Sequence, residues 1–111
     1  MDKLEKYRKI LQDIILRYAR HKPSNGEIEP ISIFDTIHDQ YLLMDVGWSK
    51  PGRVHDIVIH LQLKDGKVWV EWDGIETGIT QEMLDAGIPK EDIVLAFYTP
   101  EHRKLTDFAV A

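Results

Sequence analysis

The chain has 111 residues, no cysteine, a formal net charge of −5 and 43% apolar residues. These values are typical of a single globular domain, residues 1–111, and the missing cysteine excludes disulfide bonds and thiolate metal sites. No apolar run is long enough to cross a bilayer and no signal-like segment follows the N-terminus, so we expect a cytoplasmic protein without membrane contacts.

Residues 2–22 predict an amphipathic helix, because apolar side chains recur every three or four positions. The helix should end near His21, since Pro23, Asn25 and Gly26 disfavour its continuation. We expect its apolar side to pack on the core of the domain. That side consists of Leu4, Tyr7, Ile10, Leu11, Ile14, Ile15 and Tyr18.

The other side of this helix is basic. Residues 1–22 carry seven Lys or Arg against three Asp or Glu, whereas the rest of the chain is acidic. Two interpretations stay open: the solvated outer face of a core helix, or a site for the phosphates of a nucleic acid. The overall negative charge argues against direct DNA binding. The candidate contacts for nucleic acid are Lys6, Lys9, Arg17 and Arg20.

Between residues 28 and 73 the apolar residues alternate with a period of two, which predicts β-strands. Asp65-Gly66 is typical of a two-residue type I′ hairpin turn, and Pro51-Gly52 of the centre of a type II turn. A third two-residue turn is expected at His38-Asp39. The strands separated by these turns would form an antiparallel meander of four.

The predicted turns also determine which strand residues share a face. They place Ile59 and Leu61 beside Met44, on the same face as Ile31 and Ile33. This face is almost wholly apolar, so we expect the N-terminal helix to cover it.

The segment after Gly74 predicts short helices. Thr80 can cap one that ends at Gly87, and Thr99 with Pro100 is typical of a second helix start. The apolar run at residues 93–97 fits either a strand or a buried helix. The sequence therefore predicts an α+β fold: an N-terminal helix packed on an antiparallel four-stranded β-meander, followed by short C-terminal helices.

His55 and His60 are the first candidates for a metal or acid–base site. They are five positions apart on one predicted strand, so their side chains should leave opposite faces and cannot share a metal ion. We therefore expect no metal site and no cofactor. His60 should lie opposite Glu71, either as an oriented general base or as a simple hydrogen-bonded pair. No nucleophile is placed beside this pair, so we expect no catalytic residues and no enzyme activity.

The second face of the predicted sheet mixes aromatic, aliphatic and polar side chains, as protein interfaces do. Either this face binds a partner or the C-terminal third of the chain covers it. The candidate interface residues are Phe34, Tyr41, Leu43, Val58, His60, Trp69 and Glu71.

Five segments together resemble one known family: MDKLEKYRKILQDIILRYA, HDQYLLMDVGW, RVHDIVIHLQLKDGKVWVEWDGIETGI, GIPKEDIVLAFYTP and TDFAVA. They occur in this order over nearly the whole chain, and the chain resembles the XisI family, the fdxN element excision controlling factors of filamentous cyanobacteria. The resemblance implies an α+β fold without an established enzymatic activity or defined catalytic residues. It also implies a role, with a site-specific recombinase and a XisH-type companion protein, in the excision of a DNA element.

The resemblance and the residues together predict a non-enzymatic accessory or controlling factor. We expect it to bind a XisH-like companion and to form a homo-dimer or small homo-oligomer. Two alternatives stay open: DNA binding through the basic helix, and a nuclease-like enzyme that uses His60 and Glu71.

Overall fold

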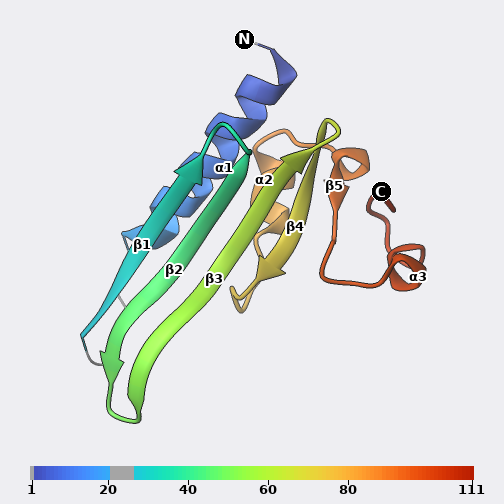
Figure 1. The fold of residues 1–111 in the computed structure, drawn as a ribbon. Helices are drawn as coiled ribbons and strands as arrows, with labels where there is room; N and C mark the ends of the chain where they lie inside the picture. Colours follow the sequence, from blue (N-terminus) through green and yellow to red (C-terminus); the bar gives the residue numbers. More distant parts are fainter. Residues whose placement is uncertain (1, 21–26) are drawn as a thin grey trace.

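The computed structural model describes residues 2–20 and 27–111. In these residues, helices α1 and α2 lie on one face of a five-stranded sheet with the order β1-β2-β3-β4-β5 (Figure 1). The helices are α1 (Lys3–Ala19), α2 (Thr80–Asp85), α3 (Pro100–Arg103) and the short 3-10 helix η1 (Lys90–Asp92). The strands are β1 (Glu27–Asp35), β2 (Gln40–Ser49), β3 (Gly52–Lys64), β4 (Lys67–Asp73) and β5 (Ile93–Val94).

Helix α1 begins and packs as its sequence predicts. The N-cap Asp2 side chain accepts a hydrogen bond from the backbone N–H of Glu5 at 2.8 Å, and the C-cap is Arg20, next to the predicted end at His21. The segment 23–26 that is predicted to stop the helix lies outside the described residues. The apolar side of α1 is confirmed as its packing face. Its buried residues are Tyr7, Leu11, Ile14 and Ile15.

One of the three predicted turns is confirmed. Asp65 and Gly66 connect β3 to β4, and both have positive φ, 54° and 77°, as a type I′ turn requires. The β2–β3 loop consists of residues 50–51 instead of Pro51-Gly52. The β1–β2 loop consists of residues 36–39 instead of two residues.

A β-bulge in β3 reverses the predicted grouping of the strand faces. Met44 lies opposite Ile57, but the preceding Leu43 lies opposite Ile59, so Val58 is an extra residue on β3. Because side chains alternate, one extra residue moves everything beyond it to the other face. The predicted placement of Ile59 beside Met44 is therefore wrong: Ile59 points toward the helices and Met44 points away from them.

A second bulge affects the β3–β4 pair. Leu61 lies opposite Val70 as predicted, but Trp72 lies opposite His60, which makes Glu71 the extra residue on β4. The predicted pairing of His60 with Glu71 is therefore wrong.

The C-terminal third supplies the strand that the predicted four-stranded meander lacks. Ile93–Val94 forms β5 and pairs in parallel with β4, beside Val68 and Trp69. A parallel pair needs a crossover connection, which the segment with α2 provides. The predicted start of α3 is confirmed, since the Thr99 hydroxyl accepts a hydrogen bond from the backbone N–H of His102 at 3.2 Å. Thr80 is the first residue of α2 and not its cap.

The hydrophobic core lies between the sheet and the helices α1 and α2. The sheet contributes Tyr41, Leu43, Ile59, Leu61, Leu63, Val68 and Val70, and the C-terminal third contributes Ile79, Met83, Ile88, Ile93 and Leu95. Among the described residues, no helix is long and apolar enough to span a membrane.

Candidate protein-interaction surface

We define the open face as the side of β1 to β4 that faces away from α1 and α2; this side of the sheet is turned toward the viewer in Figure 1. The strand pairing arranges the side chains of the open face in cross-strand rows. From the β2–β3 loop inward, the first four rows are Glu27–Trp48–Arg53, Glu29–Val46–His55, Ile31–Met44–Ile57 and Ile33–Leu42–His60–Trp72. The predicted grouping of Ile31 and Ile33 with Met44 is thus confirmed, but on the face opposite the helix.

The open face exposes several large apolar side chains. Single exposed apolar residues are ordinary, but a contiguous group of them is typical of an interaction surface. Five such residues lie in the four rows, on neighbouring strands. Their exposed fractions are 59% for Trp48, 54% for Trp72, 42% for Ile57, 41% for Ile33 and 37% for Ile31.

The surface is hollowed where β3 meets β4. A concave site of about 410 Å³ is lined by Asp56, Ile57, His60 and Trp72. It lies next to the two bulges, which turn the ring of Trp72 and the imidazole of His60 to the same side. An indole beside a hollow on an exposed face is the geometry of an interface anchor.

Charges are ordered across the rows nearest the β2–β3 loop. In the first row, Glu27 lies on β1 and Arg53 on β3, with Trp48 between them on β2. The guanidinium carbon of Arg53 lies 5.5 Å from the centre of the Trp48 ring, and an Arg53 N–H donates to the Gly47 carbonyl at 3.3 Å. The cation of this β3 residue is thereby held over the Trp48 ring and the backbone of β2.

Three of the predicted interface residues belong to the helix side of the sheet. Tyr41 and Leu43 are buried, with exposed fractions of 0% and 3%. Phe34 packs against that core with its ring 6.0 Å from the ring of Tyr41. The predicted common face is therefore wrong, because the Val58 bulge places Leu43 opposite Ile59 and not opposite His60.

Trp69 lies on the side of the sheet away from α1, but other residues of the same chain already contact its ring. Its indole N–H donates to the Lys64 carbonyl at 3.2 Å, and the cationic groups of Lys64 and Arg103 lie 4.8 Å and 5.5 Å from its ring. Arg103 also donates to the Ala96 carbonyl at 3.1 Å. The C-terminal segment thus packs on Trp69, and Trp72 is the more accessible indole of β4.

His55 and His60 lie on the same face of the sheet. His55 lies opposite Val46 and His60 opposite Leu42, and both of these β2 residues point to the open face. The predicted placement of the two imidazoles on opposite faces is wrong because the Val58 bulge lies between them. His60 contacts the Gln40 side-chain oxygen at 2.8 Å through its Nε2.

The basic side of α1 forms ion pairs within the chain. Lys9 pairs with Asp13 at 3.4 Å, and Arg17 pairs with Glu82 of α2 at 3.1 Å. Lys6 is exposed on the same helix, and Arg20 is exposed at its C-cap. The four candidate nucleic-acid contacts thus lie on α1 or at its C-cap, and part of their charge is balanced by neighbouring carboxylates.

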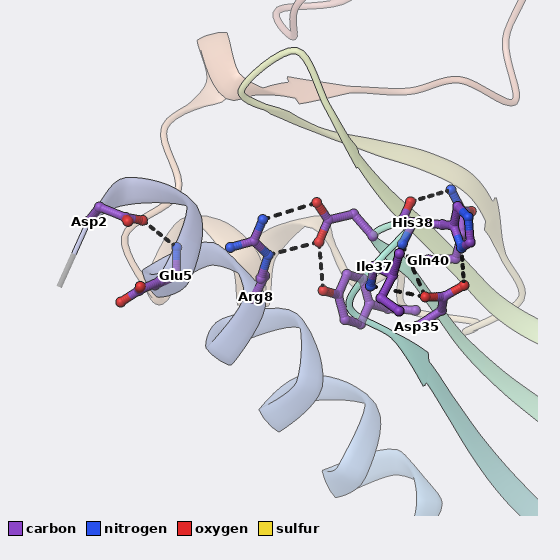
Figure 2. A network of polar contacts seen from close by, with 9 residues as sticks. Asp2, Glu5, Arg8, Asp35, Ile37, His38 and Gln40 are labelled. Carbon is purple, nitrogen blue, oxygen red and sulfur yellow. Dashed lines mark hydrogen bonds and ion pairs between the residues drawn. The ribbon is translucent and has the colours of Figure 1, made fainter.

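A polar network fixes α1 to the β1–β2 loop (Figure 2). The Arg8 guanidinium donates two hydrogen bonds to the carboxylate of Asp39, at 2.8 and 3.1 Å, and the Tyr41 hydroxyl donates to the same carboxylate at 2.8 Å. The hydrogen bond from Arg8 is the largest cause that lowers the pKa of Asp39. Burial, together with Asp39, raises the pKa of Tyr41 to about 12. This network is a structural clamp between the helix and the sheet.

Chemistry that needs a cluster of metal ligands has no site in the described residues. Within residues 2–20 and 27–111, no group of three or more His, Cys, Asp or Glu side chains could hold a metal ion. The features that stand out are the open face and the hollow beside Trp72. The sequence predicts that Ile31, Ile33 and Met44 share an apolar face, but also that the helix covers this face.

An α+β domain with helices on one face of an antiparallel sheet, extended by a parallel edge strand, is the class that this fold defines. The family model of the XisI protein matches residues 1–110 of the chain. The crystal structure of the fdxN element excision controlling factor XisI from Anabaena variabilis is similar, with a TM-score of 0.85 and 41% identity over 99% of this chain and 100% of that chain. A XisI-like protein from the same organism has a TM-score of 0.90 and 35% identity over 97% of this chain and 99% of its own.

No curated protein matches the chain significantly. The family model covers almost the whole sequence, and both solved structures are more than 30% identical over nearly their full length. The chain therefore belongs to the XisI family.

Proposed function

We propose that this protein is a non-enzymatic controlling factor of DNA-element excision, which acts by binding other proteins. The relative from Anabaena variabilis is described as an excision controlling factor, and this chain shares its fold over nearly the whole length. A factor that controls a reaction without performing it can act by contacting the proteins that perform it. The partner that we propose is a XisH-type companion, acting together with a site-specific recombinase.

The observation that carries this proposal is the open face with Trp72 at its hollow. Trp72 is 54% exposed although it is flanked by Ile57 and His60, so a partner group that enters the hollow would bury the indole and the neighbouring isoleucine together. Aromatic side chains next to pockets commonly supply a large share of the binding free energy at protein interfaces.

The proposal is tested by light scattering after size-exclusion chromatography, with the protein alone and mixed with a XisH-type companion. We expect a stable heteromeric peak. Trp72→Ala should weaken the complex roughly tenfold or more, because truncating an aromatic anchor typically costs 2 kcal/mol or above, on the order of a hot spot. Leu105→Ala is the matched control, since Leu105 is 83% exposed and lies outside the sheet.

Two outcomes would contradict the proposal. The first is that the wild-type protein forms no complex with the companion. The second is that Trp72→Ala and Leu105→Ala bind the companion as tightly as the wild type, which would remove the open face from the mechanism.

A further inference from the structure

The first two rows of the open face carry acidic groups on one margin and basic groups on the other, so the open faces of two copies can pair. In the first row the order from β1 to β3 is an acid, an aromatic ring and a base: Glu27, Trp48 and Arg53. The next row has the acid Glu29 on β1, the aliphatic Val46 on β2 and the imidazole of His55 on β3. The two rows together place two carboxylates on β1 and a guanidinium and an imidazole on β3, with Trp48 and Val46 of β2 between them.

The open faces of two copies of the chain are complementary in charge when a two-fold rotation relates the copies. A two-fold axis that runs along β2, in the plane between two stacked sheets, places β2 on β2 and β1 of each copy over β3 of the other. Glu27 of one copy then faces Arg53 of the second copy, and the reciprocal contact occurs on the opposite side of the axis. Opposite charges meet at both margins of the interface.

The centre of the same surface is apolar. The third row, Ile31–Met44–Ile57, contains no charged or hydrogen-bonding side chain, and two of its three residues are more than one-third exposed, at 37% and 42%. Two antiparallel sheets that pack face to face interdigitate such side chains at a spacing of roughly 10 Å, with their strands nearly aligned. The aligned geometry is the one that keeps β1 over β3.

We infer that the open face binds a second copy of this chain about a two-fold axis along β2, with Glu27 and Glu29 over Arg53 and His55 of that copy. This inference deepens the proposed function, on which it rests for the use of the open face in protein contacts. It assigns the rows centred on β2 to self-association. Strand β4 lies outside the strands that the axis exchanges, so Trp72 stays at the margin, beside the β3 residues that the second copy covers.

The inference is tested by charge reversal and mixing. Glu27→Arg gives a face with two basic margins, and Arg53→Glu gives a face with two acidic margins. We expect the wild type to sediment as a dimer and each single variant to dimerise roughly tenfold more weakly or worse, because like charges would face each other at both margins. An equimolar mixture of the two variants should recover the dimer mass as a heterodimer, and the double variant should recover it alone.

Asp85→Arg is the control, since it makes the same charge change in α2, on the other side of the sheet. A wild type that is monomeric at all accessible concentrations would overturn the inference. So would single variants that dimerise like the wild type, or a mixture that stays monomeric. If the reversals leave self-association unchanged while Trp72→Ala loses the companion, only this inference fails; if the companion never binds but the reversals act as expected, only the proposed function fails.

Discussion

The two faces of the sheet carry similar apolar residues, but one face is buried under the helices and the other is exposed. Ile57 and Ile59 lie two positions apart on β3, yet Ile57 is 42% exposed on the open face and Ile59 is fully buried against the helices. Two residues at this spacing normally share a face. The extra residue Val58 between them shifts the alternation, so the odd-numbered residues of β3 point to the core from Ile59 onward and to the open face before it.

Apolar residues on the sheet serve two purposes. Those beyond the bulge stabilise the folded chain, because they leave water when the chain folds. Those before it remain partly in water in the folded chain and can gain by burial only when another surface covers them. Substitutions on the two faces should therefore separate stability from association.

The largest expected effect is the difference in unfolding free energy between alanine variants of the two isoleucines. Ile59→Ala should lower the free energy of unfolding by about 2–5 kcal/mol, because it leaves a cavity in a close-packed core. Ile57→Ala should change it by no more than about 0.5–1 kcal/mol, since this side chain is already partly in water. Urea unfolding at low protein concentration measures both, and equal costs for the two variants would contradict the division of β3.

A smaller effect is expected from the clamp that holds α1 on the covered face. Asp39→Asn keeps an acceptor for Tyr41 and tolerates the positive φ of 54°, but it removes the ion pair with Arg8. Its melting temperature at neutral pH should be a few degrees lower than that of the wild type. Asp65→Asn is the matched control, because Asp65 has the same φ of 54° in an exposed turn.

The pH dependence of this effect has a definite sign. The pKa of Asp39 is lowered in the folded protein, so its contribution is fully present above the pKa of the unfolded chain, about 4, and is lost as the pH falls through the lower folded value. The difference between the wild type and Asp39→Asn should therefore shrink in acid. A difference that persists or grows well below pH ~4 would contradict the clamp.

The smallest effect on stability is expected from a pair of carboxylates on the helix side of the sheet, outside the apolar core. Asp45 on β2 lies directly opposite Asp56 on β3, and burial, followed by the charge of Asp56, raises the pKa of Asp45. A folded-state pKa above the unfolded value means that stability is highest in acid and falls as the pH rises through the folded pKa. Asp45→Asn should therefore raise the melting temperature slightly at neutral pH. Thermal unfolding tests this, and a lower melting temperature would show that the Asp45 carboxylate stabilises the fold.

Much of the fold could be predicted from local sequence alone. The helix over residues 3–19 follows from a regular apolar stripe with a capping Asp2, and the turn at Asp65-Gly66 follows from residues that tolerate positive φ. The grouping of Ile31 and Ile33 with Met44 is also confirmed, because the β1–β2 register differs from the predicted one by two residues and an even shift preserves the face. These features depend only on near neighbours in the chain.

The candidate surface could not be predicted, because it depends on single extra residues within paired strands. Tyr41 and Trp69 were assigned to one interface face, yet Tyr41 is in the core and Trp69 lies under Arg103. Nothing in the sequence around Val58 marks it as unpaired, since a bulge is a property of two strands and not of one. The pairing of β5 with β4 was likewise undetermined, because two residues carry no periodicity.

Local sequence is enough to place α1 and the hairpin turn at residues 65–66, because periodicity and turn chemistry depend on near neighbours in the chain. Which apolar residues enter the core and which remain on the open face depends on how the strands pair. That choice follows from the bulges at Val58 and Glu71, where one extra residue exchanges the two sides of a strand.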